Sequence, residues 1–510
     1  MTKSNPPRFT AIASITGSPA PGAAHPDRRW LALIVLCLGT LMIVLDTTIV
    51  NVSLPSIRQD LSFSEAALAW VINAYLLTFG GLLLLGGRLG DLFGHRRMFV
   101  AGIALFTLAS LACSLAYSQG FLVGARVVQG LGGAIVSAVG LSLVMTMFTK
   151  PAELAKAMGI YGFVAAGGGS IGVLLGGVLT GTLGWHWIFL VNVPIGAIVC
   201  ALSLVLLPAA RVAAASKRLD VAGAVTITAS LLLAVYAIVN GNHAGWTSFQ
   251  TLGLLGAAAA LLALFVIIEA RVRSPLVPLG LFRLRNLATA NVVGVLWAAA
   301  MFASFFLSAL YLQLVLGYSP LQVGLAFLPA NLIMAAFSLG LSARLVMRFG
   351  IKRPLAAGLL LATTGLALFA RAPVDANFAV DVLSSMMLIG LGAGIAFSPM
   401  LLAAPKDVSP AESGLASGVV NTSFMMGGAL GLAILASLAA SRTEALLTSG
   451  QDQLSALLSG YHVAFLIGAV FAFAAAALAA ALLCPTPAAA ANPVNPHARP
   501  ARTRGLMDCE

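Results

Sequence analysis

Charged residues are what this sequence lacks most. Only 9% of its 510 residues are charged, whereas 60% are hydrophobic, and ordinary soluble domains carry about 25% charged residues. So few charges cannot cover the surface of a soluble protein of this length. The composition therefore excludes a soluble fold and predicts a chain that is surrounded by lipid.

Residues that build metal, disulfide and nucleotide sites are also scarce. The five cysteines have no CxxC spacing, and the six histidines never form HExxH, so neither a zinc site nor a disulfide framework is expected. No GxxxxGK[ST] stretch is present, which excludes ATP hydrolysis at a P-loop. We expect no metal, no cofactor and no enzymatic activity.

Two literal matches to enzyme motifs share one apolar segment. Residues 167–172 fit GxGxxG, and residues 168–172 fit GxSxG. Both motifs need a preceding strand to form a dinucleotide site or a nucleophile elbow, and this segment is predicted to lie inside a helix. Glycines in an apolar helix indicate close helix packing instead.

Long apolar runs are abundant. A helix of about 20 residues crosses a hydrocarbon core of ~30 Å, and fourteen runs qualify. We place these spans at 30–54, 66–85, 98–117, 121–148, 154–183, 188–207, 221–240, 252–270, 287–316, 321–346, 355–371, 378–404, 414–440 and 461–483. The sequence thus predicts an all-α polytopic membrane protein with 14 transmembrane spans.

Basic residues are distributed unevenly among the loops. Most Lys and Arg fall in alternate loops and in the two tails, whereas the intervening loops hold only Arg58, Arg371 and Arg442. Loops rich in Lys and Arg stay on the cytoplasmic side, so both termini are predicted to be cytoplasmic in a multi-pass protein of the cell (inner) membrane. The net charge of +12 then reflects orientation, and no nucleic-acid partner is expected.

An internal repeat divides the chain. Residues 87–97 (GRLGDLFGHRR) follow span 2 and align with residues 343–353 (ARLVMRFGIKR) after span 10, and transporters build their sites between such repeats. The alignment predicts two six-helix bundles and an inserted helix pair. The predicted parts are a disordered cytoplasmic tail (1–29), an N-terminal bundle (30–208), spans 7 and 8 (219–270), a C-terminal bundle (286–484) and a second disordered cytoplasmic tail (485–510).

Four stretches carry a resemblance to a known family. They are residues 45–55 (LDTTIVNVSLP), 87–97, 126–134 (RVVQGLGGA) and 185–196 (WHWIFLVNVPIG). Over residues 30–483 the chain resembles the fourteen-span drug:proton antiporters of the major facilitator superfamily, the multidrug efflux type. The resemblance implies a monomeric secondary transporter that exports amphiphilic drugs or metabolites in exchange for protons by alternating access.

One departure from that family's pattern keeps a second function open. The fifth span carries Val173 where the antiporters usually have proline in GPxxGG, so its helix should be straighter. The alternative function is a carrier of the same fold dedicated to one endogenous metabolite or lipid, with or without coupling. The glycines that remain, Gly172, Gly176 and Gly177, are predicted to let helices approach closely.

Asp46 is the only carboxylate well inside a predicted span, where a charge costs about 2.5 to 3.5 kcal/mol. It lies 17 residues beyond Arg29, or roughly 25 Å along a helix. Arg126 enters span 4 from the other side and reaches a similar depth, so the two can pair. The resemblance assigns Arg126 to proton coupling, and its pair with Asp46 is predicted to be a proton switch, because burial favours the neutral carboxyl group whereas the neighbouring arginine favours the charged one. A fixed structural pair, or an Asp46 satisfied by its helical neighbours, remains the alternative.

The loop after span 2 is the predicted gate. By resemblance, Asp91 forms a conformational latch between the halves with Gly87, Gly94, Arg96 and Arg97. Its expected partner is the N-terminus of span 13, where residues 409–412 (SPAE) have a capping-box spacing and the helix dipole is positive. The alternative is a simple turn with solvated charges.

Polar residues inside the spans are candidates to line a substrate cavity, because polar groups in hydrocarbon are costly unless partnered. Residues 271–373 contain no Asp or Glu, which favours a neutral, anionic or monocationic amphiphile over a dication. Interhelical hydrogen bonds explain many of these residues equally well. The candidates are Asn51, Asn73, Tyr75, Gln129, Asn291, Tyr311, Gln313, Asn331 and Asn421.

Overall fold

The computed structural model describes residues 26–208, 220–272, 275–337, 341–403, 408 and 413–483. These residues are almost entirely helical, and no strand occurs among them. The predicted tail at 485–510 lies outside the described residues. Residues 1–25 of the predicted tail at 1–29 also lie outside them, and the first helix begins at Pro26, ahead of the apolar run.

Twelve helices in the described part of the chain are long and apolar enough to cross a membrane. The predicted spans 321–346 and 355–371 fall outside this set. In their place lie α12 (Pro320–Ala336), which has only 17 residues, and α14 (Lys352–Phe369), which begins with two charged residues. The prediction of an all-helical multi-pass protein is confirmed, but the count of 14 spans is not.

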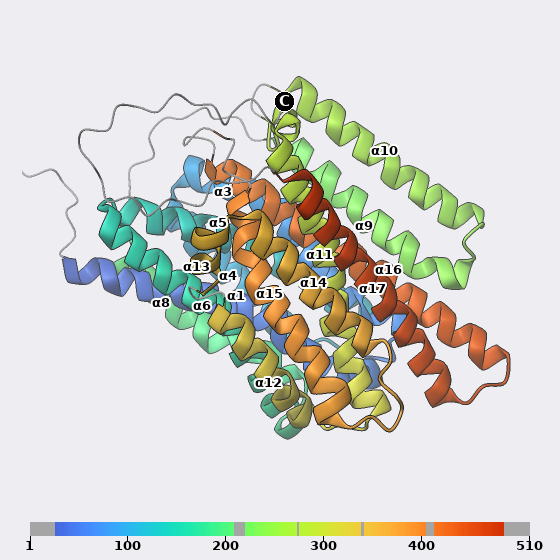
Figure 1. Cartoon of the computed structure of the whole chain (residues 1–510). Helices are drawn as coiled ribbons and strands as arrows, with labels where there is room; N and C mark the ends of the chain where they lie inside the picture. Colours follow the sequence, from blue (N-terminus) through green and yellow to red (C-terminus); the bar gives the residue numbers. More distant parts are fainter. Residues whose placement is uncertain are drawn as a thin grey trace, which may run out of the picture.

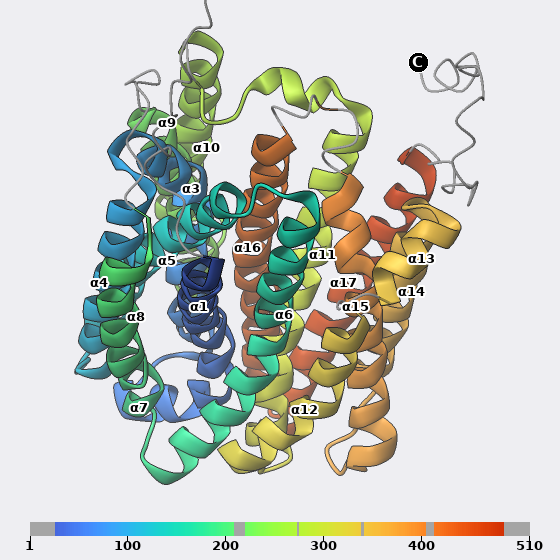
Figure 2. The same ribbon diagram turned by 90° about the vertical axis from the view of Figure 1, so that its left-hand side faces the viewer.

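The N-terminal half packs as a bundle of long helices, with α1 beside α5, α6 and α8 and with α5 beside α3 and α4 (Figure 2). Gly94 joins α3 to α4 at a φ of 94°, a backbone conformation that glycine adopts without strain. The elements are α1 (Pro26–Leu61), α2 (Glu65–Leu68), α3 (Trp70–Phe93), α4 (His95–Ser114), α5 (Gln119–Met147), α6 (Pro151–Thr182), α7 (His186–Leu190) and α8 (Asn192–Leu206).

The C-terminal half is a second bundle, in which α11 packs on α16 and α17, and α14 packs on α15 and α17. Ser319 and Gln322 form a capping box at the start of α12, which satisfies the first free N–H groups of that helix. Besides α12 and α14, its elements are η1 (Leu279–Arg283), α11 (Arg285–Leu310), η2 (Tyr311–Val315), α13 (Ser342–Phe349), η4 (Phe378–Leu383), α15 (Ser384–Ala403), α16 (Ser413–Thr448) and α17 (Gln453–Leu482).

The inserted pair, α9 (Val221–Ala244) and α10 (Phe249–Arg271), lies at one side of the molecule (Figure 1). Helix α9 packs against α3 of the first half and α16 of the second, whereas α10 packs against α9. Large apolar side chains of α10 such as Phe249, Leu252 and Ile267 are exposed. Such a surface is stable when lipid covers it.

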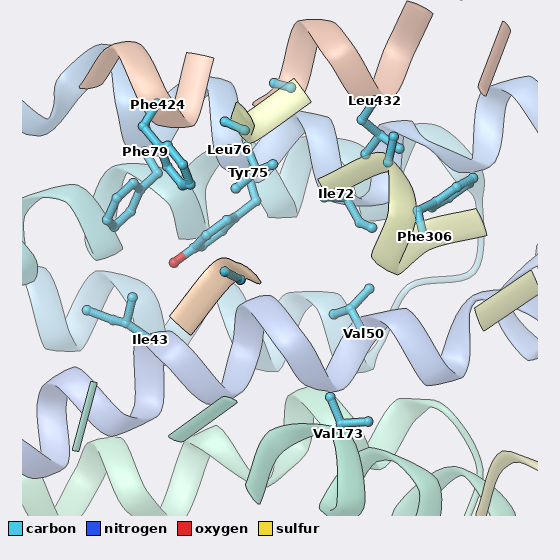
Figure 3. Close-up of a cluster of buried hydrophobic side chains, with 14 of the residues drawn as sticks. Ile43, Val50, Ile72, Tyr75, Leu76, Phe79, Val173, Phe306, Phe424 and Leu432 are labelled. Atoms are coloured by element: carbon cyan, nitrogen blue, oxygen red, sulfur yellow. The ribbon is translucent and has the colours of Figure 1, made fainter. Parts of the chain in front are cut away.

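The two halves meet along two helix pairs, α6 with α12 and α3 with α16, and α1 also touches α11 and α12. Buried apolar side chains fill the space beside α1, including Val50, Ile72 and Val173 (Figure 3). The central helix α1 therefore reaches from the interior of the first half to the boundary with the second.

Candidate functional site

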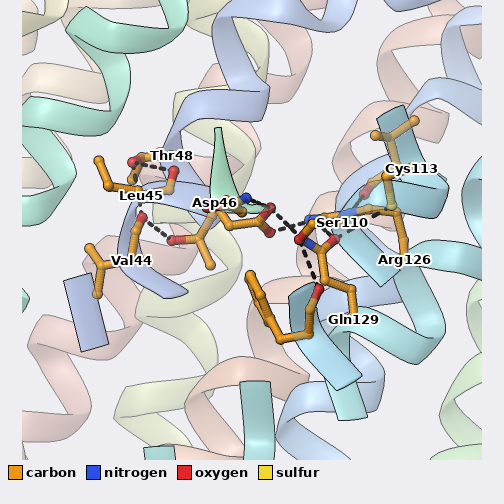
Figure 4. Close-up of polar contacts among 12 residues, drawn as sticks. Val44, Leu45, Asp46, Thr48, Ser110, Cys113, Arg126 and Gln129 are labelled. Atoms are coloured by element: carbon orange, nitrogen blue, oxygen red, sulfur yellow. Dashed lines mark hydrogen bonds and ion pairs between the residues drawn. The ribbon is translucent and has the colours of Figure 1, made fainter. Parts of the chain in front are cut away.

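The centre of the first half holds a buried charge pair. Asp46 on α1 is 0% exposed and Arg126 on α5 is 1% exposed, and the Arg126 Nη1 atom donates a hydrogen bond to Asp46 Oδ2 (Figure 4). The structure therefore brings together the two residues that depth along the helices had predicted to pair. Their part in proton coupling remains a prediction.

An amide side chain links the two charges. Gln129 Nε2 donates to Asp46 Oδ1 at 2.7 Å and to Ser110 Oγ at 2.8 Å, while Gln129 Oε1 accepts from Arg126 Nη1 at 2.7 Å (Figure 4). Arg126 and Gln129 share a helix face because they are three residues apart. Hence Gln129 is part of the charge network, and its place in a substrate cavity remains a prediction.

Further contacts complete the surroundings of the pair. Arg126 Nε donates to the Val71 carbonyl at 2.8 Å, and Asn192 Nδ2 lies 3.4 Å from Asp46 Oδ1. The Arg126 Cζ atom lies 4.4 Å from the centre of the Tyr75 ring and 5.7 Å from that of Phe189, in the range of a cation–π interaction. The guanidinium is thus enclosed by oxygens and rings that exclude water.

Two members of this network were missed as site residues. Asn192 lies in the stretch 185–196 that carries the family resemblance, but its contact with Asp46 needs the packing of α8 on α1. Ser110 is a small polar residue inside an apolar helix, and such residues are common at helix contacts. No sequence signal separates Ser110 from the other small polar residues inside the apolar helices.

Replacing Gln129 with methionine is expected to lower the free energy of unfolding by about 1 to 3 kcal/mol, the usual cost of leaving buried polar partners unsatisfied. The change keeps the side-chain length but removes both amide atoms that bridge Asp46, Arg126 and Ser110. Thermal unfolding of the purified variant in detergent measures the effect. An unfolding midpoint equal to that of the parent would contradict the network.

The other cavity candidates fall into three groups. Asn51 and Asn291 donate to carbonyls of their own helices, and Asn291 Oδ1 is buried without a partner in the described residues. Asn73 is fully buried with no partner in the described residues, and Tyr75 Oη likewise lacks a partner there. Asn421 is half-buried on α16.

Two candidates of the second half make long-range hydrogen bonds. Tyr311 Oη donates to the Pro373 carbonyl at 2.7 Å, which holds η2 to the segment after α14. Gln313 Nε2 donates to the Val52 carbonyl at 2.9 Å and so joins the second half to α1. The Gln313 contact is part of the boundary between the halves.

A cavity lies between α11, α12 and α15 of the second half. Its volume is about 20 Å³, and its wall is mostly apolar, with Asn331, Ser304 and Ser308 as polar members. Phe305 and Phe327 in this wall stack with ring centres 5.7 Å apart. Of the predicted cavity residues, only Asn331 lines this space.

The predicted packing glycines of α6 lie at close helix contacts. A Cβ atom on Gly172 would lie 2.0 Å from Thr48 Oγ1, and one on Gly176 would lie 2.6 Å from the Ile49 carbonyl oxygen. Gly177 faces the other half, where a Cβ would lie 2.6 Å from the Pro320 carbonyl oxygen. Helix α6 continues unbroken through Val173.

The predicted gate has different partners from those expected. Asp91, near the end of α3, lies 3.4 Å from the ring of His95, the first residue of α4, rather than beside Arg96 or Arg97. Arg96 donates to the Leu204 carbonyl on α8, and Arg97 is exposed. Residues 409–412, the expected partner of Asp91, lie outside the described residues, so the latch stays a prediction.

The backbone of the gate is built from glycine. Gly94 ends α3 with a positive φ, so a side chain there would be strained. Gly87 lies on α3 with the nearest foreign atom, Ala138 Cβ, 3.8 Å from where its own Cβ would be. Substitution at Gly94 is therefore the more disruptive of the two.

Two helical bundles that meet around a central helix, with a buried charge pair in the first bundle, define a polytopic membrane carrier. The sequence pattern described as Major Facilitator Superfamily matches residues 36–432, and the chain belongs to this superfamily. It is a transporter of the cell membrane and not an enzyme.

Known proteins similar to this chain include several linked to antibiotics. The puromycin resistance protein pur8 of Streptomyces alboniger is 38% identical, with 96% of this chain and 99% of the relative covered. The cephamycin export protein CmcT of Amycolatopsis lactamdurans is 38% identical, with 92% of this chain and 95% of the relative covered. The multidrug resistance protein Stp of Mycobacterium tuberculosis is 37% identical, with 82% of this chain and 77% of the relative covered.

Solved transporters share the fold. The inward-open xylose transporter XylE from E. coli is 16% identical, with a TM-score of 0.56 over 90% of this chain and 97% of the other. An inward-facing, unoccupied bacterial homologue of the human lysosomal transporter Spinster is 16% identical, with a TM-score of 0.62 over 89% and 97%. At these identities the likeness establishes the fold alone.

Proposed function

We propose that this protein exports amphiphilic drugs or metabolites in exchange for protons by alternating access. The relatives named for puromycin resistance, cephamycin export and multidrug resistance support an exporter of drug-like compounds. The observation that carries the proton coupling is the buried contact of Asp46 with Arg126. Asp46 is a titratable group at the centre of one bundle, and its helix α1 touches the other bundle.

The proposed coupling begins at the Asp46 carboxylate. When ionised, it accepts hydrogen bonds from Arg126, Gln129 and Asn192. A proton on Asp46 removes the negative charge, so charge-assisted hydrogen bonds become weaker neutral ones. Helix α1 is then held less tightly to α5 and α8. Because α1 also contacts α11 and α12, this change reaches the boundary where the halves rock.

The substrate is proposed to bind between the halves, with the cavity around Asn331 and Phe305 as its contact in the second half. The wall is apolar and aromatic, and such pockets bind amphiphiles through buried area and a few polar groups. A compound with an aromatic or aliphatic body and one hydrogen-bonding group fits this lining. We further propose that α12 with α13 and α14 complete 14 spans, with both termini cytoplasmic and the protein monomeric.

Expression in a bacterial host that lacks its own exporters tests the proposal. We expect lower cellular accumulation of several chemically different amphiphiles, puromycin among them, and loss of that effect when a protonophore removes the gradient. Export of a single compound would favour the carrier dedicated to one metabolite or lipid. Export that persists without the gradient would contradict the coupling.

A further inference from the structure

Two carboxyl groups outside the charge network lie together at the base of the inserted helices. Asp220 precedes α9 and Glu269 lies near the end of α10, and they are 6% and 3% exposed. Both face Gly223 on the first turn of α9. A Cβ atom on that glycine would lie 2.6 Å from Asp220 Oδ2 and 2.9 Å from Glu269 Oε1, so the two oxygens border the same point.

Each carboxyl group is half satisfied. Asp220 Oδ1 accepts from the Gly223 N–H at 2.7 Å, and Glu269 Oε2 accepts from the Val277 N–H at 3.2 Å. The remaining oxygens, Asp220 Oδ2 and Glu269 Oε1, are buried without a hydrogen-bond partner in the described residues. An unpartnered buried carboxyl oxygen costs free energy, so these two oxygens need a ligand between them.

Among the described residues, the surroundings of the pair are apolar. Leu85 of α3, Ala224 of α9 and Leu276 form a buried cluster there, and Leu89 and Val277 pack on it. The basic residues of the adjoining helices, Arg88 and Arg271, are exposed. Within the described ranges neither carboxyl group forms an ion pair with a basic side chain.

We propose that Asp220 and Glu269 form a proton-binding site that holds one proton between their two facing oxygens. A proton is the ligand that fits, because it converts the repulsion of two carboxylates in an apolar place into a hydrogen bond. Three or more side chains suited to hold a metal ion are found together nowhere in the described residues. The proton comes from water at the end of α10 that the charge pattern places in the cytoplasm.

The site connects the inserted pair to the gate. Glu269 binds the backbone at Val277, and the Leu276–Val277 segment packs against α3 just ahead of Gly87. Loss of the shared proton leaves two facing negative charges, which push α10 and this segment away from α9. The site thus senses cytoplasmic pH and holds the segment that leads to the second half against α3. It is independent of the proposed coupling at Asp46.

Infrared spectroscopy of the full-length protein in lipid tests the site without a transport assay. The carbonyl stretch of protonated carboxyl groups is followed during a pH titration in the parent, Glu269→Gln, Asp220→Asn and the control Glu444→Gln, whose side chain is exposed. We expect one carbonyl band that Glu269→Gln abolishes and Glu444→Gln leaves intact. In Asp220→Asn the band of Glu269 should disappear at a pH lower by about one unit or more, because the neighbouring negative charge is gone.

Three results would overturn the proposal. A Glu269→Gln protein that elutes as a folded species and retains every parental carbonyl band has no proton at this pair. An unchanged titration in Asp220→Asn means that the two groups do not share one. A parental band that calcium removes shows that the pair binds a metal cation instead. If Glu269→Gln fails to fold, the titration of Asp220→Asn decides alone.

Discussion

Replacement of Asp46 with asparagine is expected to abolish export against a concentration gradient while the protein stays folded. Asparagine fills the same space and keeps one acceptor oxygen, for either Arg126 or Gln129, but it can neither carry the charge nor bind and release the proton. Hydrogen bonds to charged groups contribute about 1.5 to 3 kcal/mol. Each such bond that is weakened therefore lowers the equilibrium constant that links proton binding to the conformational change by about tenfold or more.

Uptake of a substrate into inverted vesicles with an imposed proton gradient measures this effect. Asp375→Asn is the matched control, because Asp375 is an exposed carboxylate in the segment after α14. We expect concentrative uptake with the parent and with Asp375→Asn, and background uptake with Asp46→Asn. Full uptake with Asp46→Asn would show that the buried pair is a fixed structural contact.

The second large effect is expected where α6 meets α12. In Gly177→Val the new side chain collides with the backbone of Pro320 and Leu321, which cannot move away as a flexible side chain could. Overpacking of this kind costs about 1 to 3 kcal/mol. The cost falls on the state in which these helix ends touch, so that state should become roughly 5- to 150-fold rarer and transport should fall with it.

The distance between spin labels at Leu183 and Leu325, which are both exposed, in a background without cysteine, reports whether these ends of the halves are together. We expect longer distances to dominate in Gly177→Val. Gly181→Ala is the control, since Gly181 lies one turn further along α6 with no foreign atom within 4 Å of its Cβ position. Equal distance distributions in both variants would contradict the assigned role of the α6–α12 contact.

Depth along a helix explains why the central pair could be predicted from sequence. A charge in an apolar run fixes how far it lies from the membrane surface, so Asp46 and Arg126 could be matched before any packing was known. The amide side chains of asparagine and glutamine carry no such signal of depth in the membrane. Asn51 and Gln129 were both predicted to line a cavity, yet Asn51 bonds to its own helix and Gln129 bridges the charges, because only packing decides which face meets a partner.

The remaining differences have local causes. Asp91 and His95 belong to different helices, and the turn at Gly94 brings them together, which their spacing in the sequence alone does not predict. Asp220 and Glu269 become neighbours only when α9 packs on α10. In the span predicted at 321–346, the structure describes α12 up to Ala336 and α13 from Ser342, and residues 338–340 between them lie outside the described residues.

Proton movement driven by substrate is the most direct test of the proposed function. In proteoliposomes that hold a proton gradient and a pH-sensitive dye, addition of an amphiphilic substrate should dissipate the gradient with the parent protein. With Asp46→Asn the gradient should persist. If substrate dissipates the gradient equally with both proteins, or with neither while transport continues, export is not coupled to protons through Asp46.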